Sequence, residues 1–246
     1  MDKLKPIPRL ILIDAANFMF VFKKVATNYS CPFYESRKNA FHIIPVVHFF
    51  VARGYTVRVI ASERTLKPHV TQLSYLLKEL KAMGLIIHPL KEGKEADDLA
   101  MLKCAKDYGA IILTHDKFSN HPEFKEITKR YVVRYEKKKC KQNPDVTNNL
   151  GTECKYSFYL DGKSFVAKPN DEDYAKVEQS HKDFEKISPE NLSRLSLMEL
   201  YLHSDICSKI GAPLPEACST FLDPEMPFPV NFQQFETAAK RAFRQQ

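Results

Sequence analysis

The stretch EGKEADDLAMLKCAKDYGAIILTHDKFSN, residues 92–120, decides the fold class of the chain. Its first half repeats apolar residues at helical spacing and predicts a helix over 96–109 that ends at Gly109. The apolar run that follows predicts a buried strand over 110–116, ended by Asp116. A helix followed closely by a continuously apolar strand is typical of parallel α/β proteins.

The same alternation extends to both sides of this stretch. We expect further strands over 9–14, 56–62, 85–90 and 131–136, and helices over 37–54, 67–84 and 121–130. Pro45 lies within the first of these helices and is expected to kink it. This order predicts an α/β fold, in which helices flank both faces of a parallel sheet.

The pattern changes after residue 136. Two β-like runs in KYSFYLDGKSFVAKP (155–169) surround Asp161-Gly162 and predict a β-hairpin, whereas 139–154 reads as an exposed loop. Helical patterns return over 188–211 and 231–246. We therefore expect the main domain over 1–172, an acidic linker over 173–187 and a helical C-terminal extension over 188–246.

The composition favours a polyanionic partner. The chain of 246 residues has a formal net charge of +7, and Tyr131 and Tyr135 interleave with the cations of its most basic run, 124–141, a pattern that suits RNA contact. A solvated basic loop is the alternative. No apolar run is long enough for a membrane span, and six Cys without a Cys-x-x-Cys pair suggest reduced thiols. We expect a cytoplasmic protein, with a nuclear location left open, and no membrane partner.

Four carboxylates are expected to meet at one edge of the sheet. Asp14 and Asp116 end strands, and Asp97 and Asp98 open the helix after a third strand, so all four belong to the carboxyl ends of parallel strands. Taken singly, each could cap a helix or begin a turn. Together they repel one another unless a cation neutralises them, and carboxylate oxygens favour Mg²⁺ or Mn²⁺. Such an ion activates water towards a phosphodiester, and Asn17 could orient a water or a phosphate.

Residues near these acids and within the basic run are candidates for contact with RNA. The set predicted to bind RNA is Lys94, Lys117, Asn120, Lys129, Arg130, Arg134, Lys137 and Lys138. His115 is a tempting general base beside Asp116, but neighbours on a strand point to opposite faces, so we interpret it as structural or peripheral. Walker A and G-x-G-x-x-G loops are absent from the sequence, which argues against a nucleotide cofactor.

The order of four motifs resembles that of NYN/PIN-like ribonucleases of the Regnase (MCPIP) type. The motifs are LILIDAANF, EADDLAML, IILTHDKF and YLDGKSFVAKPND, and they extend from about residue 9 to 172. The resemblance implies a PIN-like (Rossmannoid) sheet and a Mg²⁺-dependent endoribonuclease that acts on single-stranded or loop RNA, usually messenger RNA. By position, Asp14, Asp97, Asp98 and Asp116 fall on the acidic metal site of that family, and Asn17 falls on its associated Asn.

Two features depart from the pattern of that family. Asn120 stands where the family often has a further Asp, a change that can weaken or reshape metal binding. The Cys-Cys-Cys-His zinc finger that follows the family's nuclease domain is not recognised in this sequence. RNA affinity is then expected to come from the basic run, the C-terminal helices or a partner.

These observations lead to one functional prediction with two alternatives. The prediction is a metal-dependent endoribonuclease that cleaves single-stranded RNA in RNA decay or silencing, with residues 1–172 as its nuclease domain. The family resemblance implies that this RNA is mRNA. The alternatives are a catalytically weak RNA-binding scaffold of the same fold and a structure-specific nuclease that acts on DNA. A homodimer and a protein partner docked on the C-terminal helices are further expectations.

Overall fold

A single mixed sheet forms the centre of the protein. The computed structural model describes residues 5–26, 38–90, 93, 95–137 and 156–209. The strand order of the sheet is β6-β4-β2-β7-β8-β9, in which the first five strands are parallel and β9 runs antiparallel to β8. The strands are β2 (Ile11–Asp14), β4 (Val57–Ile60), β6 (Ile86–Ile87), β7 (Ile111–Leu113), β8 (Val132–Lys137) and β9 (Tyr156–Tyr159). The predicted α/β fold with a mostly parallel sheet is confirmed.

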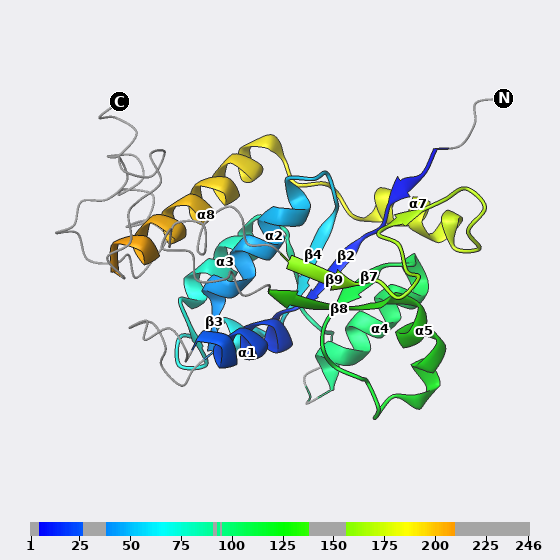
Figure 1. Cartoon of the computed structure of the whole chain (residues 1–246), viewed down its shortest axis with the longest axis horizontal. Helices are drawn as coiled ribbons and strands as arrows, with labels where there is room; N and C mark the ends of the chain where they lie inside the picture. Colours follow the sequence, from blue (N-terminus) through cyan, green and yellow to red (C-terminus); the bar gives the residue numbers. More distant parts are fainter. Residues whose placement is uncertain (1–4, 27–37, 91–92, 94, 138–155, 210–246) are drawn as a thin grey trace.

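Helices cover both faces of this sheet (Figure 1). On one side α1, α2 and α3 pack against the strands and α8 packs on α2, and on the other side α4 and α5 pack against the strands and α7 packs on α4. The helices are α1 (Ala15–Ala26), α2 (Ile43–Val51), α3 (Ser74–Ala82), α4 (Ala96–Tyr108), α5 (Lys125–Tyr131), α7 (Tyr174–Asp183) and α8 (Pro189–Lys209). Among the described residues, no helix is long and apolar enough to cross a membrane.

Short elements complete the fold. Two small sheets pair β1 (Ile7–Pro8) with β10 (Val166–Ala167), and β3 (Lys38–Asn39) with β5 (Thr71–Gln72). The 3₁₀ turns are η2 (Ala40–His42), η3 (Glu63–Leu66) and η4 (Pro122–Phe124).

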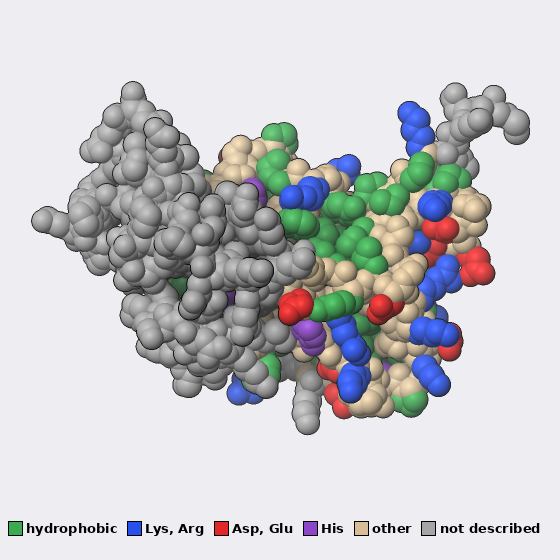
Figure 2. All heavy atoms as spheres, viewed as in Figure 1, with side chains coloured by type: hydrophobic (Ala, Val, Ile, Leu, Met, Phe, Trp, Pro, Cys, Tyr) green, Lys and Arg blue, Asp and Glu red, His purple; other side chains and the backbone are tan. Residues whose placement is uncertain are grey.

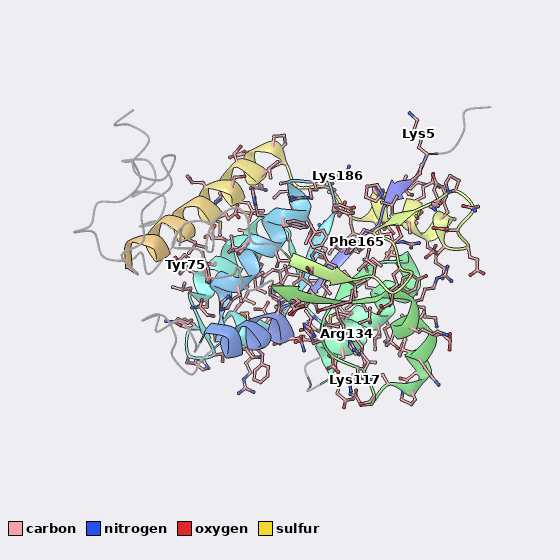
Figure 3. All side chains as sticks on the ribbon, in the orientation of Figure 1. Lys5, Tyr75, Lys117, Arg134, Phe165 and Lys186 are labelled. Atoms are coloured by element: carbon pink, nitrogen blue, oxygen red, sulfur yellow. The ribbon has the colours of Figure 1, made fainter. Side chains whose placement is uncertain are left out.

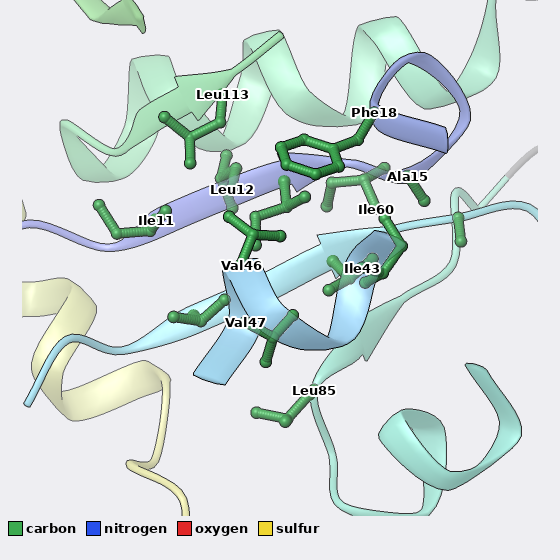
Figure 4. Packing of buried hydrophobic residues seen from close by; sticks show 14 of the residues in the cluster. Ile11, Leu12, Ala15, Phe18, Ile43, Val46, Val47, Ile60, Leu85 and Leu113 are labelled. Carbon is green, nitrogen blue, oxygen red and sulfur yellow. The ribbon is translucent and has the colours of Figure 1, made fainter. Parts of the chain in front are cut away.

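The central strand β2 lies at the middle of the hydrophobic core. Its residues Ile11, Leu12 and Ile13 are 0% exposed, because helices cover the strand on both faces. Figure 4 shows Ile11 and Leu12 together with Phe18 from α1 and Leu113 from β7. Full burial of an aliphatic side chain contributes about 1.5–3 kcal/mol, so this packing holds β2 firmly in place. The strand in turn fixes the residue at its end, which is Asp14.

Some helix boundaries differ from the sequence prediction. The helix α1 was not predicted, although it follows β2 without an intervening loop. The helix expected over 37–54 begins only at Ile43, so Pro45 falls in its first turn, where a missing N–H costs no helical bond and a kink is not required. The helix expected over 67–84 begins only at Ser74, after Leu73 in a left-handed conformation with φ of 54°.

The hairpin expected within 155–169 is wrong. The strand β9 pairs with β8, and β10 pairs with β1, so the two runs belong to different sheets. The turn itself is present, because Asp161 and Gly162 have φ angles of 44° and 78° and the Lys163 N–H donates to the Leu160 carbonyl over 2.7 Å. A turn signal therefore predicted the local bend but not the partner of each strand. The loop expected over 139–154 and the helix expected over 231–246 lie outside the described residues.

The predicted linker and extension pack on the α/β core. The helix α7 occupies most of 173–187 and contacts α4 and β1, while α8 buries Leu195, Met198 and Leu202 against the core. Ser188 precedes α8 as expected of a helix start, and its Oγ accepts a 3.2 Å hydrogen bond from the Asn191 N–H. The domain boundaries stay a prediction, but the described part of the extension shares the hydrophobic core with the sheet.

Candidate active site

A pocket of about 530 Å³ lies at the carboxyl end of the parallel strands. The structure brings the four predicted carboxylates together in its wall, along with Asn17 and Asn120. The lining residues are Asp14, Ala16, Asn17, Phe20, Lys38, Glu95, Asp97, Asp98, Asp116, Ser119 and Asn120. This is the edge at which ligands bind in open α/β sheets.

Each carboxylate reaches the pocket from a different element. Asp14 is the last residue of β2, and Asp97 and Asp98 belong to the first turn of α4. A helix begins with unpaired N–H groups and a partial positive charge, which stabilises carboxylates in that first turn. Asp116 lies in the loop beyond β7, which ends at Leu113, so the expectation that Asp116 ends the strand is wrong by three residues.

Hydrogen bonds hold Asp14 and Asp116 in one network. Asp14 Oδ1 accepts from the Asn17 N–H over 2.9 Å, and Asp14 Oδ2 accepts from Thr114 Oγ1 over 2.8 Å. Thr114 Oγ1 in turn accepts from the Asp116 N–H over 3.0 Å, and Asp116 Oδ1 accepts from the Phe118 N–H over 3.0 Å. The loop after β7 is therefore tied to the end of β2 through Thr114, which is completely buried.

The amide of Asn17 is oriented by the same loop. Its Oδ1 accepts from the His115 backbone N–H over 3.0 Å and from the Tyr135 hydroxyl over 3.5 Å. Because two donors occupy this oxygen, the Asn17 NH₂ group is the part left to interact with a ligand in the pocket. Asn17 is therefore suited to donate to a phosphate or a water.

His115 supports the site through its backbone and through packing of its ring. Its ring lies edge-on to that of Tyr135, with 4.6 Å between the ring centroids. Its Nε2 is buried and has no hydrogen-bond partner among the described residues. His115 follows β7 rather than lying in it, so the strand-face argument does not apply, but these contacts agree with a structural role.

Burial, and for two of them the neighbouring carboxylates, raises the pKa values of three acids in the pocket. Burial, partly offset by the hydrogen bonds from Asn17 and Thr114, raises the pKa of Asp14 to about 6. Burial and the nearby charges of Asp116 and Asp14 raise the pKa of Asp98 to about 6. Burial also raises the pKa of Asp97, against the opposing charge of Lys38 and the Ser62 backbone N–H. Such a cluster favours binding of a cation, because a cation removes the mutual repulsion.

The donor set fits a hard divalent cation that keeps part of its water shell. Five carboxylates and one Lys line the pocket among the described residues, and buried Asp97 Oδ1 has no hydrogen-bond partner in the same part of the chain. Oxygen donors of this kind suit Mg²⁺ or Mn²⁺. In the described ranges no three His, Cys, Asp or Glu side chains stand close enough to ligate one ion directly. Mg²⁺ commonly takes one or two carboxylates and several waters, which matches this wider spacing.

The residues predicted to bind RNA lie in separate parts of the structure. Asn120 lines the pocket, while Lys117 and Arg134 are exposed outside its wall, and Figure 3 shows both in the lower half of the view near α1 and α4. Lys129 and Arg130 line a different cavity, beside α5, so the structure does not bring them to the acids. Lys94, Lys138 and the side chain of Lys137 lie outside the described residues.

The prediction that the Tyr residues of the basic run contribute to RNA contact is wrong. Tyr131 and Tyr135 are only 4% and 1% exposed. Tyr131 donates a hydrogen bond to Asp173 over 2.8 Å, and the Tyr135 ring stacks on that of Phe18 with centroids 4.3 Å apart. Both aromatic rings therefore serve the core and are not available to stack on bases.

Two charged residues of the pocket were not predicted. Lys38 in β3 is the one cation among the described lining residues, and its charge opposes the rise in the pKa of Asp97. Glu95, at the N-cap position of α4, adds a fifth carboxylate. Glu95 stands two residues before Asp97, so spacing along the sequence offered a signal. Lys38 reaches the pocket through the small β3-β5 sheet, which the sequence did not indicate.

One known protein family matches more than half of the chain. Residues 8–154, more than half of the chain, match the family model described as the Zc3h12a-like ribonuclease NYN domain. No curated protein matches the chain closely enough to count as a relative. The matched range contains the four carboxylates, Asn17 and Lys38, and the chain belongs to the family of Zc3h12a-like ribonuclease NYN domains.

Proposed function

We propose that the protein is a metal-dependent endoribonuclease that cleaves single-stranded RNA with Mg²⁺ or Mn²⁺. The observation that carries the proposal is the convergence of Asp14, Asp97, Asp98 and Asp116 in one pocket of a ribonuclease-family domain. Bound there, a divalent cation would supply a Lewis acid and the means to activate water at neutral pH. We place the reaction in RNA decay or silencing, in line with the family resemblance, and the protein in the cytoplasm, in line with the reduced thiols that its Cys pattern suggests.

The residues of the chain have separate roles in this proposal. Asp97 and Asp98 in the first turn of α4 and Asp14 at the end of β2 would hold the cation, in part through its water shell. The Asn17 NH₂ group donates to a phosphate oxygen, because its carbonyl is already engaged by His115. The Lys38 ammonium lines the same pocket and offsets part of the negative charge that a phosphodiester brings to the acids.

The test is cleavage of single-stranded RNA in Mn²⁺ by the wild type and by two variants of α4. Asp98→Asn should lower the cleavage rate by at least about 100-fold, since removal of even an outer partner of a metal site costs 10–100-fold. Asp107→Asn is the matched control, because Asp107 is exposed on the same helix and does not line the pocket. Equal rates for Asp98→Asn and the wild type would overturn the proposal.

A catalytically weak RNA-binding scaffold is the second candidate. The wide spacing of the acids in the described residues, which suits an ion held partly through water, also suits a site that binds an ion only weakly. RNA binding without Mn²⁺-dependent cleavage would support the scaffold. Matched RNA and DNA oligonucleotides in the same assay distinguish a ribonuclease from a nuclease that acts on DNA.

A further inference from the structure

A second cavity, of about 660 Å³, lies at the opposite edge of the sheet from the acidic pocket. Arg9, which comes before β2, and Ile111, which begins β7, form part of its wall, whereas the acidic pocket lies beyond the other ends of these strands. From Arg9 to Asp14 the chain advances five residues, or about 17 Å at strand spacing. The α5 helix and the turn that contains Asp161 and Gly162 form further parts of the wall.

The wall of this cavity carries more positive than negative charge. Six Lys or Arg residues and three Asp or Glu residues line it. Figure 2 shows Lys and Arg side chains along the right-hand margin of the molecule, over α5 and beside α7, with Asp and Glu among them. The four lysines of the wall are Lys129, Lys163, Lys168 and Lys176.

The two arginines of the wall are already paired with acidic residues that directly precede α7. Arg9 is 6% exposed and donates to Asp173 over 2.6 Å and 3.1 Å, and Arg130 donates to Glu172 over 2.9 Å. The lysines are held differently. Lys176 Nζ donates to the Lys106 carbonyl over 3.0 Å, a bond that leaves its charge in place. With the arginines paired in this way, four lysines face the three acidic residues of the wall, and the lysines supply its remaining positive charge.

Lys163 is the most enclosed of these lysines. Its side chain is only 13% exposed, and its ion pair with Asp161 Oδ2 is 3.9 Å long, which is beyond hydrogen-bond distance. The turn presents it in a fixed place, because Asp161 and Gly162 are both left-handed and the Lys163 N–H closes the turn on the Leu160 carbonyl. A lysine side chain enclosed in this way keeps ammonium donors for an acceptor, and an anion in the cavity would satisfy them.

We propose that this cavity binds backbone phosphates of an RNA strand, at a distance from the site of cleavage. The proposal deepens the proposed function, because it rests on RNA being the substrate. The aromatic residue of the wall, Tyr131, is 4% exposed and bonded to Asp173, so it is not placed to stack on a base. Contacts by lysines alone recognise phosphates and carry no base information. The site therefore adds affinity without adding sequence preference.

The experiment compares two triple variants of equal charge. The cavity variant is Lys129→Gln, Lys163→Gln and Lys168→Gln, and the control variant is Lys67→Gln, Lys78→Gln and Lys182→Gln, which replaces exposed lysines that do not line the cavity. Binding of a fluorescent, unstructured 20-nucleotide RNA is measured in chelator over a range of salt concentrations. Thermal unfolding of each variant shows that it is folded.

The cavity variant should bind the RNA about tenfold or more weakly at low salt. The slope of log Kobs against log salt should fall by about 2 in magnitude, which corresponds to three lost phosphate contacts on a single strand. The control should change by less than about twofold, and single-stranded DNA of any sequence should lose affinity for the cavity variant by the same factor as RNA. Equal losses in both variants, or a loss confined to one RNA sequence, would overturn the proposal.

The outcome of this binding experiment can be distinguished from that of the cleavage experiment that tests the proposed function. If the wild type cleaves RNA and the cavity variant binds as the wild type does, only the phosphate cavity is wrong. If the cavity variant loses RNA affinity and the wild type does not cleave, the cavity stands and the nuclease proposal is wrong.

Discussion

Thr114 Oγ1 donates a 2.8 Å hydrogen bond to Asp14 Oδ2 and thereby joins the residue after β7 to the last residue of β2. Both side chains are buried, at 0% and 5% exposure. The bond stabilises the ionised form of Asp14, in opposition to the burial that raises the pKa of this carboxyl to about 6. The protonation of the acidic pocket therefore depends on a hydroxyl that does not itself line the pocket.

The Thr114→Val variant tests this dependence, since Val keeps the shape and removes the donor. A hydrogen bond to a charged group contributes about 1.5–3 kcal/mol, or about one to two pKa units. The acid limb of the pH–rate profile should therefore move to higher pH by about one unit. Thr128→Val removes a surface hydroxyl on α5 and should leave the profile unchanged. A uniform fall in rate at every pH would indicate damaged folding instead.

Divalent cations should stabilise the folded protein. Binding to the native state alone raises the free energy of unfolding by about 2.7 kcal/mol at a ligand concentration 100 times Kd. Thermal unfolding with and without Mn²⁺ measures this gain, which chelator should reverse. Asp97→Asn should lose most of the gain, because Asp97 Oδ1 is buried and lacks a hydrogen-bond partner within the described residues. Asp107→Asn should keep it, and a gain of the same size in both variants would place the ion elsewhere.

Without a cation, stability should fall as pH rises through the range in which Asp14 ionises. The folded pKa is raised from 3.8 to about 6, so the folded state holds its proton more tightly than the unfolded chain does. The loss of unfolding free energy that ionised Asp14 causes is absent below about pH 4 and complete above about pH 6. It amounts to about 3 kcal/mol at most. Urea unfolding in chelator should show Asp14→Asn to be more stable than the wild type at pH 7.5.

The acidic pocket could be predicted because it depends on one geometric rule. The carboxyl ends of parallel strands share an edge, so Asp14 and the start of α4 had to lie close together once the strands were recognised. Gly109 was equally predictable, since its left-handed φ of 61° is the common way to end a helix. Both inferences use only local sequence and a general property of sheets.

Other features depend on contacts between distant segments. Strand pairing decides that β9 joins β8 and β10 joins β1, and a turn at Asp161 does not reveal this choice. Lys38 reaches the pocket only because β3 pairs with β5. The burial of Tyr135 did have a local signal, because Val133 and Tyr135 alternate with exposed Arg134 and Glu136 along β8.

The described part of the C-terminal extension should be needed for stability. Leu195 of α8 is 0% exposed in the same core as the sheet, and large-to-small substitutions at such sites cost about 2–5 kcal/mol. Leu195→Ala should lower the free energy of unfolding by this amount in urea titrations. Ser193→Ala, at an exposed position of the same helix, should change it by less than about 0.5 kcal/mol. If Leu195→Ala lowered the free energy of unfolding as little as Ser193→Ala does, α8 would be a unit separate from the core.

The ion pair between Arg9 and Asp173 should be the most sensitive link between the start of the chain and the segment predicted as a linker. Asp173 is 2% exposed, and although burial opposes its ionisation, hydrogen bonds from Arg9 and Tyr131 hold its pKa below the usual range. Asp173→Asn leaves the buried Arg9 charge without its closest partner, a change that typically costs about 3–5 kcal/mol. Asp171→Asn is the control, since its 3.4 Å pair with Arg9 is partly exposed and contributes about 1 kcal/mol or less.

The effect of Asp173→Asn should also depend on pH. A lowered carboxyl pKa stabilises the fold above the unfolded pKa, so the difference in stability between wild type and Asp173→Asn should shrink as pH falls below about 4. Equal urea midpoints for the two variants at pH 7 would show that the pair does not hold α7 against the sheet.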